Sequence, residues 1–357
     1  MFIISKLLDK VYSTSFMKAK YYYNNMKDHK SLEVQHIADK KLPIYYIIRY
    51  NDDMSCGWTV WERVVLFGCI YAIDHNMIPV VDMQTNKNIY LEDDEVGKVN
   101  AWEKYYDQPC GVSLKRALNS NNYVLGDPSQ EWFVYVRMRK KKCENVDFLR
   151  ECYSKYINLK NSIRTICEDN YRKIIDKEDA KLVGICLRGT DYLLFHHPQQ
   201  PQIDVVTENA KDIFKKLNCD YYFVATEDFN SFNELKKKLP QDKMVSFGAG
   251  NIKEANGLIG EQIRKSKSAY DSSINYLTIL YILNKCQALI GGKCGATIVA
   301  EYRKTYTSSG RNRRSGSHGC KDNNVKRNSS GRNETGGYPK QPGKSSQIQR
   351  TDGFKYH

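Results

Sequence analysis

From residue 181 onward, short apolar runs alternate with stretches in which apolar residues recur at helical spacing. In chain order, the strand-like and helix-like patterns cover residues 181–187, 204–217, 221–225, 229–239, 244–247, 272–285 and 288–290. Parallel strands are joined by crossovers, which are usually helices, so this alternation predicts a doubly wound parallel sheet. Ligands bind such sheets just beyond the carboxyl ends of the strands, and the residues after each apolar run are therefore the first candidates for a site.

A second α/β unit is predicted upstream. An aromatic-rich apolar run at residues 44–50 is typical of a buried strand, residues 58–76 carry a helical pattern, and Pro79 stands near the start of the next strand. Together with the later sheet, this βαβ unit predicts two Rossmann-like domains. We expect residues 84–130 to be irregular and residues 131–179 to be mostly helical. The predicted divisions are a helical segment 1–41, a first α/β domain 42–150, a helical connection 151–179, a second α/β domain 180–302 and a basic tail 303–357.

Composition indicates the cellular compartment in which we expect the chain to act. Its 357 residues suffice for two domains, and no apolar stretch approaches the roughly 20 residues that span a bilayer. The 11 cysteines include no Cys-x-x-Cys pair, which favours a reducing compartment and argues against a structural metal. The N-terminal apolar run is too short for a signal-peptide core. We therefore expect a cytoplasmic protein without a metal site.

The first residues have one apolar helical face, formed by Ile3, Ile4, Leu7, Leu8 and Val11. Such a face usually docks on the protein that carries it, and this is the interpretation that we favour. The same face is suited to a membrane surface, so a peripheral position at the inner face of a membrane is the alternative.

The positive charge is concentrated at the C-terminus. Residues 303–357 hold 13 Lys and Arg against 3 Asp and Glu, so they carry +10 of the chain's net charge of +14. They contain no Leu, Ala, Met or Trp, and such a segment cannot bury enough apolar surface to offset its ordering entropy, so we expect this tail to be disordered. One interpretation is a natural basic arm for nucleic acid or anionic lipid. The favoured hypothesis is a reading-frame shift that replaced the native C-terminus. No nucleic acid is expected to bind the folded body.

The apolar run at residues 181–187 ends abruptly in Arg188, Gly189, Thr190 and Asp191. An arginine at a strand end can hold a phosphate through paired, charge-assisted hydrogen bonds. Thr190 and Asp191 would then hold the loop or contact a sugar. Alternatively, Arg188 and Asp191 only pair with each other across a turn, and spacing alone leaves both interpretations open.

The segment Leu187-Arg188-Gly189-Thr190-Asp191-Tyr192 resembles the His-x-Arg-x-Thr-Asp element of the α-1,6- and protein O-fucosyltransferase superfamily. Cys186 stands where that family often has His, and Tyr192 stands where some members have Lys. Further upstream, residues 100–110 look like a segment of bacterial-type relatives that act on surface polysaccharides. Cys56-Gly57-Trp58 and residues 78–82 are similar to the opening βαβ unit of those relatives. The resemblance covers roughly residues 42–302.

This resemblance implies a glycosyltransferase of the GT-B type with its donor site in residues 180–302. It implies transfer of a sugar, fucose from GDP-fucose in the first instance, to a glycan hydroxyl, with inversion and without a metal ion. The nucleotide sugar is the donor substrate, and no cofactor is expected. Arg188 would bind the pyrophosphate, flanked by Gly189, Thr190 and Tyr192, and Asp191 would orient Arg188 or bind the donor.

Residues 291–297 form a glycine-rich turn between a strand and a helix. Backbone N–H groups and the helix N-terminus can cradle a phosphate there. The turn lacks the Gly-Lys-Ser/Thr ending of a nucleotide-hydrolysing P-loop, and a simple tight turn explains it equally well. Relatives often place Ser in this turn, where this chain has Cys294 and Gly295. The expected donor contacts are Gly292, Lys293, Cys294, Gly295, Ala296 and Thr297.

Other polar clusters have two interpretations each. Thr226, Glu227 and Asp228 follow a strand, where they would bind guanine or ribose, or cap the next helix. Asp271-Ser272-Ser273 is interpreted first as a helix N-cap. Asp53, between the first strand and its helix, is a candidate general base for the acceptor hydroxyl or merely shapes the turn.

His196 and His197 suggest a metal, but no third ligand is suitably spaced, so an exposed or acceptor-side loop is expected.

Two other functional classes are left open. The chain is alternatively a catalytically degenerate protein that binds a sugar nucleotide or glycan. The second alternative is a binder of nucleic acid or anionic surfaces that acts through residues 303–357.

Overall fold

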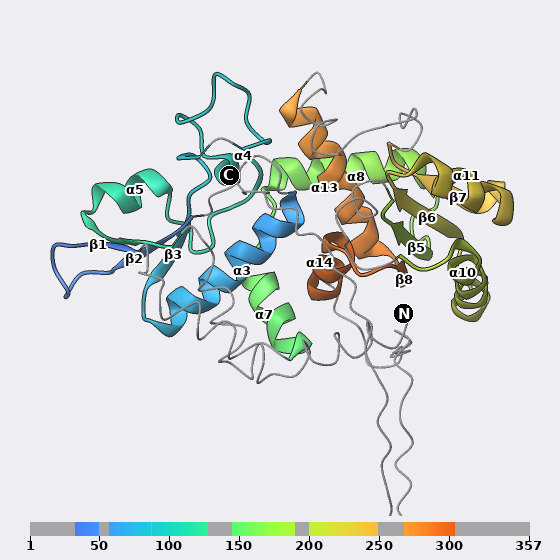
Figure 1. Cartoon of the computed structure of the whole chain (residues 1–357), viewed down its shortest axis with the longest axis horizontal. Coiled ribbons are helices and arrows are strands. Elements are labelled where there is room, and N and C mark those ends of the chain that lie inside the picture. Colours follow the sequence, from blue (N-terminus) through green and yellow to red (C-terminus); the bar gives the residue numbers. More distant parts are fainter. Residues whose placement is uncertain are drawn as a thin grey trace, which may run out of the picture. The chain divides into compact units, whose positions relative to one another are not determined.

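The computed structural model describes residues 33–49, 57–86, 88–127, 145–189, 200–248 and 268–303 (Figure 1). Several predictions from the sequence lie outside these residues and stay predictions. They concern the N-terminal apolar face, the tail after residue 303, and Asp53, Thr190, Asp191, Tyr192, His196 and His197.

The second half of the chain forms the predicted parallel sheet. Its strands are β5 (Leu182–Leu187), β6 (Tyr221–Thr226), β7 (Met244–Ser246) and β8 (Ala288–Gly291), in the spatial order β7-β6-β5-β8. All three pairings are parallel. Every residue of β5 is buried, as expected for a central strand that is covered on both faces.

Helices cover both faces of this sheet, so the doubly wound arrangement is confirmed. On one face, Val183 and Ile185 pack with α10 (Ile203–Leu217) and α11 (Phe229–Lys238). On the other face, Leu182 and Cys186 share a core with α8 (Asn161–Ile174) and α13 (Ala269–Lys285). Figure 1 shows α10 and α11 beside the strands β5–β7. A short 3-10 helix, η2 (Gln241–Lys243), leads into β7.

The first half contains a mixed sheet. Its order is β1 (Val34–Ile37), β4 (Asn122–Leu125), β2 (Tyr45–Ile48), β3 (Ile78–Val81). β2 is parallel to both β3 and β4, and only β1 is antiparallel. The predicted βαβ crossover is α3 (Trp58–Asp74). This helix is buried nearly all round because it contacts β2, β3, α7 (Val146–Tyr156) and α14 (Gly295–Arg303).

Three expectations about the extent of the elements were wrong. Residues 84–130 are not wholly irregular, because they contain α4 (Ala101–Tyr105), α5 (Leu114–Asn119) and β4. The segment 1–41 ends in a strand, β1, rather than in helix. Arg303 belongs to α14 and not to the tail. β1 and β4 are short strands, and their pairing with each other rather than a local period fixes them.

The cap of α13 also differs from the expected one. The N-cap is Ser268, whose side chain accepts a hydrogen bond from the backbone N–H of Asp271, so the helix starts one turn before Ser272. Over the described residues, we find no helix both long enough and apolar enough to cross a membrane.

Candidate functional site

Three loops meet at the carboxyl edge of the parallel sheet. The β5–β6 pairing places Leu187 beside Thr226, and the β5–β8 pairing places Cys186 beside Gly291. The residues that follow these strands are therefore neighbours. We call them the strand-end cluster: Arg188, Gly189, Glu227, Asp228 and Gly292–Thr297. The strand-end residues that the sequence marks as first candidates for a site therefore lie together in the structure.

Arg188 is held by a carboxylate from the neighbouring strand end. Its Nε lies 3.1 Å from Oε1 of Glu227, and the same oxygen accepts a 2.9 Å hydrogen bond from the backbone N–H of Gly189. The Arg188 side chain is 20% exposed, so it is held in place yet still reachable from solvent. Glu227 thus orients Arg188 and fixes the loop that carries it.

Gly189 is required by the close approach of two loops. A Cβ at this position would lie 2.4 Å from the Cβ of Asp228. Asp228 caps α11, because its Oδ2 accepts hydrogen bonds from the backbone N–H and the hydroxyl of Ser231. The Thr226 hydroxyl accepts from the Asp228 N–H at 3.1 Å. The capping interpretation is therefore confirmed for Asp228, while a donor contact by Thr226 or Asp228 stays a prediction.

The glycine-rich turn is organised by Thr297. Its hydroxyl oxygen accepts a 3.0 Å hydrogen bond from the Cys294 N–H and lies 3.0 Å from the Gly292 carbonyl oxygen, to which it can donate. Lys293 is exposed, whereas Cys294 and Ala296 are buried. A ligand at this turn would therefore meet the Lys293 ammonium and backbone N–H groups rather than the side chains of Cys294 or Ala296.

Gln200 belongs to the site, although sequence reasoning assigned it no role. Its Oε1 accepts a 3.2 Å hydrogen bond from the Arg188 N–H. A Cβ on Gly292 would lie only 2.1 Å from that same oxygen, so the Gln200 amide lies between the two loops. Its position in a Pro- and Gln-rich loop carries no periodic signal that would have identified it.

The N-terminal ends of two helices lie side by side at the turn. A Cβ on Gly295, the first residue of α14, would lie 2.3 Å from Oγ1 of Thr59, in the first turn of α3. Helix N-termini carry partial positive charge, so both add to the field of Arg188 and Lys293. The sequence did not single out Thr59, although it follows the Cys56-Gly57-Trp58 segment directly.

The charge of Arg188 also lowers the pKa of one neighbouring group, Cys294, and limits the rise in the pKa of another, Tyr276. The pKa of the Cys294 thiol is lowered to about 6, first by its hydrogen bond with Cys186 and further by Thr297 and Arg188, against the effect of burial. Burial raises the pKa of Tyr276, and Arg188 and the Thr59 hydroxyl act against that rise. Tyr276, on α13, is thus a further neighbour that sequence reasoning missed.

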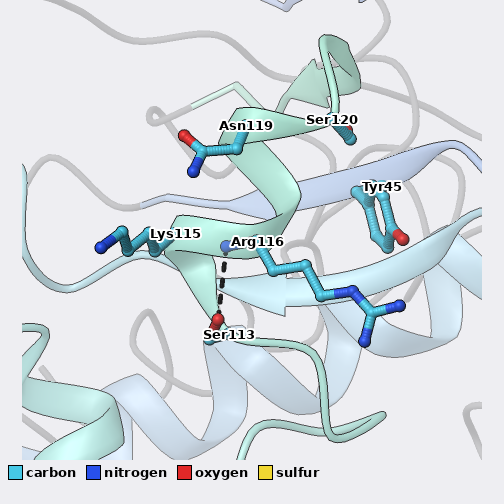
Figure 2. Close-up of a pocket in the computed structure, with 6 residues that line it drawn as sticks. All are labelled: Tyr45, Ser113, Lys115, Arg116, Asn119 and Ser120. Carbon is cyan, nitrogen blue, oxygen red and sulfur yellow. Dashed lines mark hydrogen bonds between the residues drawn. The ribbon is translucent and has the colours of Figure 1, made fainter.

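A surface pocket elsewhere in the chain is not the candidate site. Its lining residues, drawn in Figure 2, are Tyr45, Ser113, Lys115, Arg116, Asn119 and Ser120. Tyr45 is the first residue of β2, so the pocket lies at the amino end of that strand. Ligands of open α/β sheets bind at the carboxyl ends, which argues for the strand-end cluster instead.

No group of three or more His, Cys, Asp or Glu suited to a metal ion occurs among the residues that the structure describes.

No protein-family model matches this sequence, and no curated protein matches it either. Among solved structures, the NodZ α-1,6-fucosyltransferase soaked with GDP-fucose is similar, with 13% identity and a TM-score of 0.44 over 73% of this chain and 92% of that one. Fucosyltransferase NodZ from Bradyrhizobium is similar with 12% identity and a TM-score of 0.42, over 70% of this chain and 88% of that one. A variant of Arabidopsis thaliana FUT1 in complex with GDP is similar with 11% identity and a TM-score of 0.43, over 85% of this chain and 77% of that one. At these TM-scores the similarity carries no functional argument, so function has to be argued from the chain's own residues.

Proposed function

We propose that this chain is a glycosyltransferase that takes fucose from GDP-fucose and transfers it to a glycan hydroxyl. The observation that carries the proposal is the guanidinium of Arg188, which Glu227 holds at the carboxyl edge of a parallel sheet beside a glycine-rich turn. An oriented arginine next to backbone N–H groups is suited to a diphosphate. The resemblance of residues 187–192 to the fucosyltransferase element supports the same ligand.

The chemistry requires negative charge to be stabilised as the diphosphate leaves. The contact with Glu227 is made through Nε of Arg188, and the terminal fork of the guanidinium is the part that would grip the diphosphate. Lys293 and the N–H groups at the start of α14 would meet the remaining phosphate oxygens. Preorganised donors of this kind lower the barrier most when their positions are already fixed, as the Glu227 contact fixes Arg188.

The finer parts of the proposal rest on the resemblance. They are inversion at the sugar carbon, metal-independent catalysis and fucose as the transferred sugar. Inversion by a single displacement needs a general base for the acceptor hydroxyl, and Asp53 is proposed for it. Asp53 precedes α3 in the sequence and lies outside the described residues, and the first turn of α3 packs against Gly295 of the strand-end cluster. Asp191 is proposed to bind the donor or to orient Arg188.

The test is calorimetric titration of GDP and of GDP-fucose into the wild-type protein and its variants. We expect micromolar binding that Arg188→Ala weakens at least about tenfold, because a charge-assisted bidentate contact is worth more than 1.4 kcal/mol. Arg188→Lys should rescue only part of this loss, because an ammonium cannot form the planar fork. The matched control is Arg172→Ala on α8, whose side chain is 72% exposed and pairs with Glu168.

Equal GDP affinity in wild type and Arg188→Ala would overturn the proposal. A product assay with glycan acceptors then separates transfer from mere binding. GDP-fucose binding without turnover would favour the alternative of a sugar-nucleotide-binding protein, for which the buried Cys294 in place of a serine hydroxyl is the supporting observation.

A further inference from the structure

Two buried cysteines face each other beneath the strand-end cluster. Cys186 lies on β5, two residues before Arg188, and Cys294 lies in the glycine-rich turn directly before α14. Their Sγ atoms are 3.8 Å apart, and the two residues are only 4% and 3% exposed. Each thiol therefore has the other as a close neighbour, and each is attached to a loop of the proposed donor site.

We propose that Cys186 and Cys294 are an oxidation site, at which hydrogen peroxide converts the two thiols into a disulfide that ties the glycine-rich turn to β5. The formation of the disulfide is independent of the proposed function. Its effect on GDP binding, argued below, rests on the proposed function.

The geometry allows this bond with a small movement of the turn. A disulfide needs its sulfur atoms about 2.05 Å apart, so the thiols must approach each other from van der Waals contact. Cys294 lies beyond the end of the β8 ladder, which is held by the pairing of Cys186 with Gly291. Gly291 and Gly292 have no side chains, so their backbone dihedral angles have a wide allowed range. The turn can therefore move while the ladder stays paired.

The two thiols differ in acidity, which assigns their roles. The pKa of Cys294 is lowered to about 6 by its hydrogen bond with Cys186, assisted by Thr297, whose hydroxyl lies 3.6 Å from the Cys294 sulfur, and by the nearby Arg188 charge. The pKa of Cys186 is raised well above its ordinary value by that same hydrogen bond and by burial. Because the thiolate is the nucleophile, Cys294 attacks the oxidant and Cys186 resolves the product.

The reaction balances in two steps. The Cys294 thiolate attacks one peroxide oxygen, so an S–O bond forms, the O–O bond breaks, and the departing hydroxide takes up a proton to become water. The Cys186 sulfur then attacks the sulfenic sulfur of Cys294, forming the S–S bond and releasing a second water with the Cys186 proton. Two thiols lose two electrons in total, and the two peroxide oxygens gain them.

Oxidation would disturb the turn that the proposed donor site uses. The Thr297 hydroxyl lies 3.6 Å from the Cys294 sulfur and bonds to the backbone of the same turn. Drawing Cys294 toward β5 changes this contact and shifts the first N–H groups of α14. We therefore expect the oxidised protein to bind GDP about tenfold more weakly than the reduced protein.

The primary experiment is a peptide map of the full-length wild-type protein after treatment with hydrogen peroxide and blocking of the remaining thiols. Trypsin should release Leu182–Arg188 and Cys294–Arg303, each with a single cysteine. The expected result is a linked pair of these two peptides that a dithiol reductant separates. If no such pair forms under conditions that oxidise the exposed Cys110, the proposal is overturned.

Variants then test the order of events. In Cys186→Ser, Cys294 should persist as a sulfenic acid that a 1,3-diketone probe labels, whereas Cys294→Ser should leave Cys186 unlabelled. The matched control, Cys219→Ser, alters another buried cysteine and should retain the linked peptide. The rate of oxidation should rise with pH through about 6 and then level off. A rise only near the range of ordinary thiols, around 8.5, would contradict the assignment of Cys294 as the attacking group.

Titration of GDP separates this proposal from the proposed function. Weaker binding after oxidation, restored by reductant and absent in Cys294→Ser, supports both. A linked peptide together with unchanged GDP affinity overturns the expected effect on the donor site. A linked peptide in a protein that binds no GDP in either state supports the oxidation site and contradicts the donor site alone.

Discussion

Gly291 ends β8 where that strand comes closest to β5. A Cβ on this residue would lie 1.9 Å from the carbonyl oxygen of Cys186 and 2.9 Å from its carbonyl carbon. The obstacle is backbone, which cannot rotate aside as a side chain can. Residue 291 must therefore be glycine if β8 is to pair with β5 and place the following turn beside Arg188.

Gly291→Ala should consequently separate the two strands. We expect a loss of about 3 kcal/mol in the free energy of unfolding, the upper end of the cost of overpacking, measured by urea denaturation. Gly57→Ala is the control, because a Cβ there meets nothing within 4 Å. Since Gly57 is the N-cap of α3, where Ala is less favourable than Gly, this variant should stay within about 1 kcal/mol of wild type. Equal midpoints for the two variants would contradict the close approach.

The residues of the site differ in how readily the sequence reveals them. Arg188, Gly189 and Asp228 were identifiable because strand-end positions and capping chemistry leave local signals. Gln200 and Tyr276 were not, because their roles depend on contacts with residues far away in the chain. Glu227 is predicted as a donor contact, which stays a prediction, and its contact with Nε of Arg188 became visible only in the structure.

At the scale of elements, a buried ion pair fixes α14 against α3. Glu62 on α3 is fully buried, and the Arg303 guanidinium at the end of α14 forms an ion pair with it. The Tyr106 hydroxyl donates a 2.6 Å hydrogen bond to Glu62, and Nε of Arg303 donates one of 2.7 Å to the Tyr153 hydroxyl. Through this group α14, which begins at the glycine-rich turn, is attached to α3 and α7.

Arg303→Gln should therefore be severely destabilising. It leaves the Glu62 carboxylate buried without its cation, which typically costs about 3–5 kcal/mol in the free energy of unfolding. The double variant Glu62→Gln/Arg303→Gln should recover part of that loss, because no net charge is then buried. Arg172→Gln, at an exposed ion pair, should change stability by less than about 1 kcal/mol. Strictly additive single and double variants would argue against the pair.

Over the whole molecule, several tyrosine hydroxyls are shielded from water. Burial is the main cause that raises the pKa of Tyr106 and of Tyr153 well above the ordinary value of 10.0. Burial likewise raises the pKa of Tyr46 and Tyr105. Below pH 10 these groups are protonated in both the folded and the unfolded chain. Above it the unfolded chain releases their protons while the folded chain retains them, so stability falls as pH rises.

Alkaline titration should show this linkage. Each shielded tyrosine lowers the free energy of unfolding by about 1.4 kcal/mol per pH unit above roughly pH 10. Urea midpoints measured at neutral pH and at several alkaline values give the slope. Tyr106→Phe should have a shallower alkaline slope than wild type, and Tyr281→Phe, which replaces a half-buried tyrosine on α13, serves as the control. An unchanged slope in Tyr106→Phe would rule out its contribution.

Much of the architecture follows from local sequence. The sequence alone determined the parallel sheet of the second half, because the continuous apolar runs of β5 and β6 alternate with the helical patterns of α10 and α11. It also determined which residues stand at the strand ends, since chain order and parallel pairing place Arg188, Thr226 and Gly291 at one edge.

Only the tertiary structure decided what no local period encodes. β1 and β4 are strands because they pair with each other across the sequence, and Arg303 is a core residue because Glu62 lies opposite it. The contact between Cys186 and Cys294 likewise exists only after β8 has paired with β5. Such features arise from contacts between distant residues, whereas a strand or helix period reports only which face of one segment is buried.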